Sequence, residues 1–243
     1  MALQLADGEP EARPWRAESL TAVIGSLIGG GHAAGAADWA GPVVLAVDGR
    51  SSSGKTTLAA RICDAVPRSV VVHTDDIAWQ HSRFGWTDLL VEGILTPARQ
   101  GVAVSYRPPR WSEHGRPGFI DVPSDCPLLV VEGDGAGRRE VAHLIDALIW
   151  VQSDEREAER RRLRRAGSPP AADMANMPAD GTAPDLSGWM AEEVPFNAAQ
   201  RTWERADVIV CGTPQIRYDP VTEIVVASPL TPPEDPTDSP FGG

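Results

Sequence analysis

Residues 49–56 read Gly-Arg-Ser-Ser-Ser-Gly-Lys-Thr and fit the pattern GxxxxGK[ST], which constrains the fold more than any other feature of the sequence. This loop directly follows the apolar, β-branched run 43–47 and directly precedes a stretch with helical character, 54–64. Its glycines let successive backbone N–H groups turn toward an anion, and the N-terminus of the helix adds its dipole. We therefore predict a strand–loop–helix unit that binds the phosphates of a nucleotide.

The composition strengthens this prediction, because Lys55 is the one lysine among 22 basic residues. Roughly 0.001 chance matches to the pattern are expected in a chain of this composition. In such loops the ammonium reaches the β/γ-phosphates and the hydroxyl of Thr56 binds Mg²⁺. The alternative is a Gly/Ser-rich turn with a solvated lysine, and it must also explain the flanking strand and helix. The residues predicted to hold the nucleotide are Gly49, Ser51, Ser52, Ser53, Gly54, Lys55, Thr56 and Thr57.

Overall composition excludes several other classes of protein. The 243 residues suit one α/β domain, and a formal charge of -12 argues against a general nucleic-acid binder. No apolar run approaches the ~18 residues of a membrane helix. The first twenty residues are too acidic for a secretory signal, and the three cysteines lack a CxxC pair, which fits a reducing compartment. We expect a cytoplasmic protein with a small-molecule partner and no nucleic-acid or membrane partner, and a homodimer stays open.

The pattern of apolar runs predicts the architecture of the sheet. Short buried strands are expected at 43–47, 70–73, 128–131, 147–151 and 207–211, with helices between them. Together with the phosphate loop, such alternation predicts an α/β protein with the P-loop NTPase fold, a three-layer αβα arrangement with a five-stranded parallel sheet as its middle layer. Residues 15–28 are expected to form one amphipathic helix, and residues 223–227 are a candidate edge strand. In parallel sheets of this kind, ligands bind beyond the carboxyl ends of the strands.

Two further observations narrow the class of P-loop protein. GTPases read their base with Asn-Lys-x-Asp, and this chain has no lysine left for that motif. Residues 134–137 match the loose pattern DxxG, which carries little information in a Gly-rich segment. The chain is also short for a large ATPase machine. A small phosphotransferase remains, which must position an acceptor hydroxyl and screen the charge of the transferring phosphoryl group.

The order of five motifs resembles that of uridine kinase-like phosphotransferases, a family that includes kinases of uridine, nicotinamide riboside, pantothenate and ribulose phosphate. The motifs are 47–49 before the loop, 74–77 after the second strand, 131–133 after the third, an Arg-rich helix after the fourth, and 206–209 at the fifth. The resemblance covers about residues 43–212. It implies a kinase domain over 43–227, which an N-terminal extension over 1–42 precedes. Five prolines and three acids predict a disordered Pro-rich tail over 228–243.

The resemblance also implies roles for the acids at the strand ends. The family places an aspartate after the second strand as the base for the acceptor hydroxyl, which implies Asp75, with Asp76 adjacent and not distinguished from it. Either aspartate could instead cap the following segment. Glu132 is expected near the metal or the acceptor hydroxyl, so that Thr56, Asp75 and Glu132 form the predicted metal set. Asp48 could reach the same site or only satisfy backbone groups.

A lid is expected over 154–190, where the resemblance implies that arginines close over the phosphates. Arg161, Arg162 and Arg165 match the lid spacing best, although Ala166 stands where the family has aspartate. The alternative is a solvated helix whose arginines pair with neighbouring glutamates.

An aromatic insertion over 79–124 is expected to bind the acceptor, because aromatic faces could stack on a planar ring and arginines could bond its polar edge. A small satellite core under a long loop is the alternative. The candidate substrate-binding residues are Trp79, Trp86, Tyr106, Arg107, Arg110 and Trp111. His73 and Asp75 have H-x-D spacing, but without a third ligand we expect no dedicated metal site.

Three hypotheses for function follow. The first is an ATP- and Mg²⁺-dependent kinase that phosphorylates a hydroxyl of a nucleoside or nucleoside-like molecule. The second keeps this chemistry with an antibiotic or other specialised metabolite as acceptor. The third is a nucleotide-dependent binding or regulatory protein with weak turnover.

Overall fold

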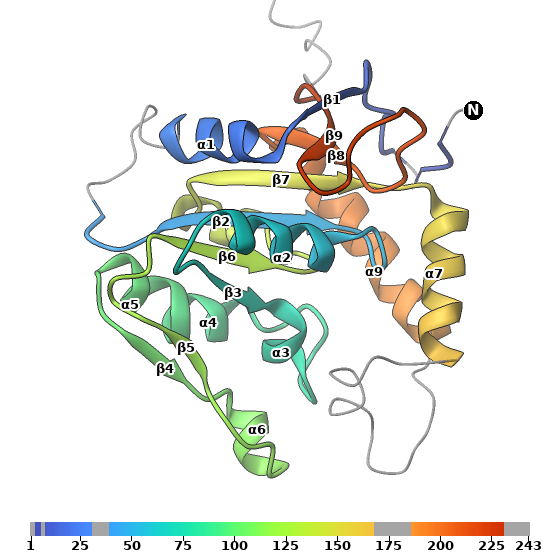
Figure 1. Cartoon of the computed structure of the whole chain (residues 1–243). Helices are drawn as coiled ribbons and strands as arrows, with labels where there is room; N and C mark the ends of the chain where they lie inside the picture. Colours follow the sequence, from blue (N-terminus) through green and yellow to red (C-terminus); the bar gives the residue numbers. More distant parts are fainter. Residues whose placement is uncertain (1–2, 6–7, 31–38, 168–185, 231–243) are drawn as a thin grey trace, which may run out of the picture.

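The strand that precedes the phosphate loop lies at the centre of the parallel part of the sheet. The computed structural model describes residues 3–5, 8–30, 39–167 and 186–230. In it β2 (Val43–Gly49) pairs in parallel with β6 (Leu128–Glu132) on one side and β7 (Ala147–Gln152) on the other. β3 (Val70–His73) and β8 (Val208–Cys211) continue the sheet outward, also in parallel. The prediction of five parallel strands is confirmed (Figure 1).

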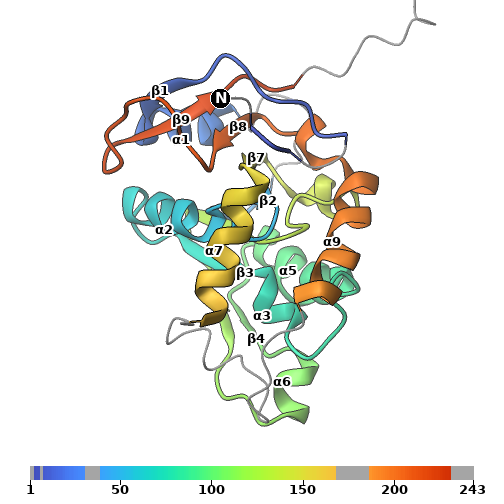
Figure 2. The ribbon, with the colours of Figure 1, turned by 90° about the vertical axis from the view of Figure 1, so that its right-hand side faces the viewer.

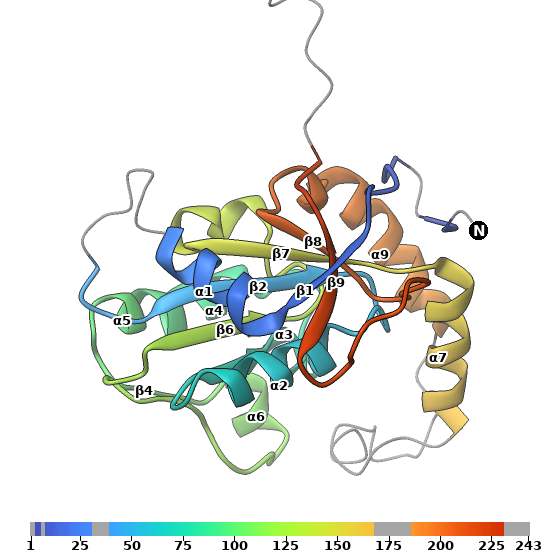
Figure 3. The same cartoon turned by 45° about the horizontal axis from the view of Figure 1, so that its top comes forward.

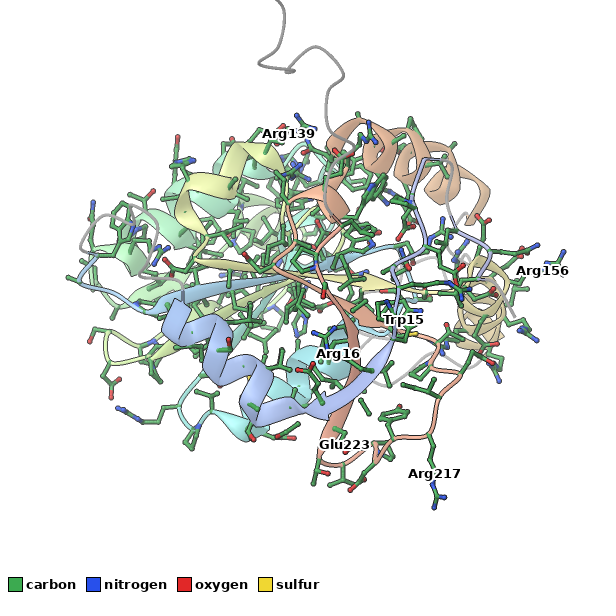
Figure 4. All side chains as sticks on the ribbon, turned by 90° about the horizontal axis from the view of Figure 1, so that it is seen from above. Trp15, Arg16, Arg139, Arg156, Arg217 and Glu223 are labelled. Carbon is green, nitrogen blue, oxygen red and sulfur yellow. The ribbon has the colours of Figure 1, made fainter. Side chains whose placement is uncertain are left out.

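Two antiparallel strands extend this sheet to seven. β9 (Glu223–Ala227) forms as expected and pairs with β8, but it is not an edge strand, because β1 (Arg16–Ser19) pairs with its other side. The predicted helix over 15–28 is therefore wrong in its first turn, because residues 16–19 pair with a strand about 200 residues away and α1 (Leu20–Gly30) begins after them. Figure 3 shows β1 alongside β9, and Figure 4 shows Arg16 and Glu223 near opposite ends of this pair.

Helices cover both faces of the sheet and make the three layers that the sequence predicts. Side chains alternate along β2, so that Leu45 and Val47 pack with α1 and α2 (Lys55–Ala65) on one face. Val44 and Ala46 face the opposite layer, which contains helices of the insertion together with Trp150 and Trp203. The P-loop NTPase fold is thus present, with a mixed sheet whose parallel part is central.

The many glycines and prolines of residues 77–124 predict an irregular segment, and this prediction is wrong, because most of residues 74–122 form regular elements. They are α3 (Thr74–Ala78), α4 (Thr87–Leu90), a π-helical turn η1 (Val91–Leu95), α5 (Thr96–Arg99), β4 (Val104–Tyr106), α6 (Pro109–Glu113) and β5 (Ile120–Val122). Gly93 and Pro97 obscure the helical pattern in the sequence. A Cβ at Gly93 would lie 2.6 Å from the Tyr106 ring, so the strand pair β4–β5 needs glycine there.

A buried ion pair fixes this insertion to the sheet. Arg99 Nη1 lies 2.6 Å from Asp146 Oδ2, and both side chains are almost fully buried. The guanidinium also donates to the carbonyl oxygens of Leu144 and Pro42, and the Asp146 carboxylate accepts from the Val44 N–H. The pair is therefore satisfied on both sides, as a buried charge must be.

The carboxyl ends of the parallel strands meet at one edge, which faces the viewer in Figure 2. α7 (Glu155–Gly167) and α9 (Leu186–Gln200) flank this edge. Two short 3₁₀ helices, η2 (Arg139–Leu144) and η3 (Thr202–Glu204), precede β7 and β8. Residues 168–185 of the expected lid and 231–243 of the expected tail lie outside the described residues. Within the described residues, no helix is long and apolar enough to span a membrane.

Candidate nucleotide-binding and catalytic site

The phosphate loop connects β2 directly to α2, as the sequence predicts. Gly54 stands before the first residue of α2 with a φ of 108°, a conformation that favours glycine. The hydroxyl oxygens of Ser52 and Ser53 are buried, and neither has a hydrogen-bond partner among the described residues. Buried hydroxyls normally find partners. These two unsatisfied groups and the helix N-terminus therefore fit a ligand rich in acceptor oxygens, such as a nucleotide phosphate.

Lys55 is held in this loop by three contacts. Its Nζ donates to the carbonyl oxygens of Gly49 and Arg50, each at 2.8 Å, and to Asp134 Oδ1 at 3.0 Å. Burial lowers the pKa of Lys55, but the charges of Asp134 and Glu132 outweigh burial and hold the pKa above its usual value. The ammonium is therefore charged at neutral pH.

Thr56 and Glu132 form the core of the predicted metal set. Thr56 Oγ1 donates to Glu132 Oε1 at 3.2 Å, and Glu132 Oε2 lies 2.6 Å from His73 Nδ1. Burial raises the pKa of Glu132, but the hydrogen bond with His73 and the charge of Lys55 outweigh it and lower the pKa. A hydroxyl beside an ionised carboxylate suits Mg²⁺, which usually takes one or two carboxylates together with substrate phosphates.

No group of three His, Cys, Asp or Glu side chains in the described part of the chain could hold a metal by itself. Mg²⁺ at Thr56 and Glu132 would therefore depend on ligands that the nucleotide supplies.

The structure separates the two aspartates that the sequence could not distinguish. Both lie in the first turn of α3, where neighbouring residues point in different directions. Asp76 Oδ1 pairs with Arg116 Nη2 at 2.5 Å, and the Arg116 guanidinium stacks 3.8 Å from the centre of the Trp111 ring. Asp75 instead lies within the electrostatic range of Asp134, Lys55 and Glu132. Asp75 is thus the aspartate at the phosphate loop.

The environment of Asp75 tunes its carboxylate toward a neutral pKa. Water reaches this residue, yet protein atoms crowd its carboxylate, and this crowding raises the pKa to about 6. The neighbouring charge of Asp134 adds to the shift, while Lys55 opposes it. A carboxylate with such a pKa is a suitable proton acceptor near neutral pH.

Asp48 takes the structural role that the sequence left as an alternative. Its Oδ1 accepts from the N–H groups of Gly49 and Gly135, at 2.7 and 2.9 Å, and its Oδ2 accepts from Gly137 N–H at 3.0 Å. Burial raises the pKa of Asp48 to about 6. The side chain therefore holds the loop after β6 against the phosphate loop.

The arginines of α7 divide between the site and solvent. Arg161 Nη1 lies 3.5 Å from the carbonyl oxygen of Ser53, while its Nε pairs with Glu157 on the same helix. Arg156 points outward from α7 (Figure 4). Arg162 is half-buried on α7, and the side chain of Arg165 lies outside the described residues. The structure therefore brings Arg161, one of the three predicted lid arginines, to the loop.

A cavity of about 360 Å³ opens beside the phosphate loop. Gly212, after β8, approaches so closely that a Cβ there would lie 2.1 Å from the Ser53 carbonyl oxygen. The cavity is lined by residues of the phosphate loop, α2, α7 and the segment after β8, among them Ser53, Thr57, Arg61, Arg161, Pro214 and Tyr218. Its position next to the loop suits the nucleoside part of a nucleotide whose phosphates bind at Lys55.

The candidate substrate-binding residues are mostly structural. Trp86 is buried in the core, where Arg138 stacks 3.9 Å from its ring centre, so we correct the expectation that it contacts substrate. Trp111 is likewise buried and donates from Nε1 to the Asp76 carbonyl oxygen. Arg107 donates to the Arg116 carbonyl oxygen, and Arg110 pairs with Glu113 on the surface.

Trp79 and Tyr106 are half-buried and pack against the same core. The rings of Trp79 and His114 meet edge to face, and the Arg116 guanidinium lies 5.3 Å from the centre of the Trp79 ring. The satellite core that the sequence left as an alternative therefore accounts for most of the aromatic insertion.

Three site residues escaped the sequence analysis. Asp134, which contacts Lys55, lies in the DxxG match, a pattern that carries little information in a Gly-rich segment. His73 contacts Glu132, whereas its H-x-D spacing with Asp75 points only to a metal ligand. Glu193 of α9 accepts a hydrogen bond from the Ser51 N–H at 2.6 Å, and no pattern in the sequence signals this contact.

Comparison with solved structures finds similar chain arrangements at low sequence identity. A candidate fructose transport system kinase from Silicibacter sp. TM1040 is 16% identical, with 74% of this chain and 95% of that chain covered at a TM-score of 0.48. A possible uridine kinase from Bacillus stearothermophilus is 19% identical, with 77% and 98% covered at a TM-score of 0.38. No protein-family model and no curated protein matches the chain.

Proposed function

We propose that this protein is an ATP- and Mg²⁺-dependent kinase that transfers the γ-phosphoryl group to a hydroxyl of a nucleoside or nucleoside-like small molecule. One observation carries the proposal: Lys55 and Asp75 share one electrostatic environment at the carboxyl ends of β2 and β3. A phosphate-binding cation and a carboxylate of raised pKa are the two groups that phosphoryl transfer to a hydroxyl requires.

Each residue then has a defined part in the reaction. Lys55 and the N–H groups of the loop bind the β/γ-phosphates and orient the γ-phosphorus toward the acceptor. Asp75 accepts the proton of the acceptor hydroxyl as the hydroxyl oxygen forms a bond to the γ-phosphorus. The bond from the γ-phosphorus to the bridging oxygen breaks at the same time and releases ADP. Arg161 adds positive charge beside the loop. Thr56 and Glu132 would hold Mg²⁺, which when bound neutralises charge on the phosphates.

The cavity beside the loop supports a nucleotide as the phosphoryl donor. It lies on the α2 and β8 side of the loop, while Asp75 lies on the β3 side. Donor and acceptor would therefore approach the γ-phosphate from different strands. This leaves the acceptor between α3 and the phosphate loop.

Acceptor-stimulated release of ADP tests the proposal. Purified protein with MgATP is assayed against nucleosides, and in parallel against aminoglycoside and other polyhydroxylated metabolites. We expect one acceptor class to raise ADP release well above the rate without acceptor, and the class that does so decides between the first two hypotheses. If no compound raises ADP release above the rate without acceptor, the kinase hypothesis is refuted. A protein that binds nucleotide but shows no such stimulation would support the binding-protein hypothesis.

A further inference from the structure

An acidic side chain from α9 reaches the backbone of the phosphate loop. Glu193 Oε1 accepts the hydrogen bond of the Ser51 N–H at 2.6 Å, and the residue is 2% exposed. Ser51 and Glu193 are 142 positions apart in the sequence, so this contact depends on the docking of α9 against the site. Loop N–H groups of this kind are the ones that bind phosphate oxygens in nucleotide-binding loops.

The charges around Glu193 are those that a phosphate group would meet. Burial and the nearby Asp134 raise the pKa of Glu193, whereas Lys55 and Arg50 favour its ionised form. A carboxylate oxygen and a phosphate oxygen compete for the Ser51 N–H. Two anions that both lie within hydrogen-bond distance of this one donor also repel each other. A nucleotide phosphate therefore binds Ser51 N–H only after the Glu193 carboxylate has left it.

The same helix contacts the insertion on the acceptor side. Phe196 lies three residues after Glu193, and its ring stacks on Phe84 with a centroid distance of 3.8 Å and an interplanar angle of 7°. The Arg138 guanidinium lies 4.9 Å from the Phe196 ring centre and 3.9 Å from that of Trp86. Movement of α9 at the phosphate loop would thus disturb a stack that belongs to the insertion.

We propose that Glu193 is an internal competitor of the nucleotide: its carboxylate takes a phosphate position in the free protein, and nucleotide binding displaces it together with α9. The displacement changes the Phe84–Phe196 contact and thereby links occupancy of the phosphate loop to the acceptor side. This inference rests on the proposed function only in requiring that a nucleotide binds the loop.

Binding of ADP and of inorganic pyrophosphate, measured by calorimetry, tests the competition. The variants are Glu193→Ala, which removes the competing acceptor, and Glu193→Gln, which keeps the size and an acceptor oxygen but removes the charge. Glu192→Gln is the matched control, because Glu192 is the exposed neighbour on the same helix. We expect at least about tenfold tighter binding to Glu193→Ala, the change that one charge-assisted hydrogen bond corresponds to, and a smaller gain for Glu193→Gln.

The outcomes separate this inference from the proposed function. Equal binding by the wild type and both Glu193 variants, or weaker binding by them, refutes the competition while the nucleotide site stands. No binding of ADP by any of the four proteins refutes the nucleotide site and the competition together. If Glu193→Ala does not fold, Glu193→Gln carries the comparison alone.

Hydrogen exchange provides an independent readout of the displacement. In the wild type, ADP should speed amide exchange in α9, and in Glu193→Gln the exchange without ADP should already be faster. Unchanged protection of α9 in wild-type protein saturated with ADP would refute the displacement.

Discussion

The raised pKa of Asp75 predicts the pH dependence of the reaction. A general base acts in its deprotonated form, so the rate should rise as pH passes through the pKa of about 6. With a single titrating group of this pKa, the deprotonated fraction rises about tenfold between pH 5 and pH 7. We therefore expect kcat/KM for the acceptor, measured at saturating MgATP, to increase by about this factor and to level off above pH 7.

Two neighbouring variants isolate this effect. Asp75→Asn should lower kcat by about 10²- to 10⁴-fold, the usual contribution of a general base, and should abolish the inflection near pH 6. The pH dependence that remains in Asp75→Asn also shows any contribution from titration of the nucleotide. Asp76→Asn is the control, because Asp76 pairs with Arg116 and should keep both the inflection and most of the rate. A wild-type rate that is flat from pH 5 to pH 7, or an Asp75→Asn rate within tenfold of the wild type, would refute the assignment of the base.

Three further perturbations test other parts of the site and fold. Lys55→Met removes the ammonium that three acceptors hold in the loop, so ATP affinity measured by calorimetry should fall by at least about 100-fold. A loss below tenfold would contradict the role of Lys55 in phosphate binding. His73→Ala leaves Glu132 Oε2 without its His73 partner, so the Mg²⁺ concentration for half-maximal activity should rise about tenfold. His73→Gln should bring this concentration most of the way back to the wild-type value. An unchanged Mg²⁺ requirement in His73→Ala would argue against positioning of Glu132 by His73. Arg99→Ala leaves the buried Asp146 carboxylate unpaired, so the free energy of unfolding in urea should fall by about 3–5 kcal/mol, and a loss under 1 kcal/mol would show that the pair does not anchor the insertion.

Local patterns in the sequence were sufficient for the phosphate loop and the strands next to it. A strand buried on both faces is apolar along its whole length, and the loop needs glycine, lysine and threonine at fixed spacing. The same reasoning failed where pairing was distant. Residues 16–19 form β1 by pairing with β9, and Trp86 lies in the core, where the Arg138 guanidinium stacks on its ring. Neither partner is near in the sequence.

The site shows the same division more sharply. Short-range patterns predict the P-loop, the place of Lys55 in it and the acids after β3 and β6, because each of these features depends on residues within one short segment. The electrostatic environment of Asp75, the contact of Asp134 with Lys55 and the contact of Glu193 with the Ser51 backbone depend instead on the packing of distant segments. Adjacent residues on a helix point in different directions, and a helix such as α9 meets the loop only through the packing of the whole sheet, so these contacts follow from the fold alone.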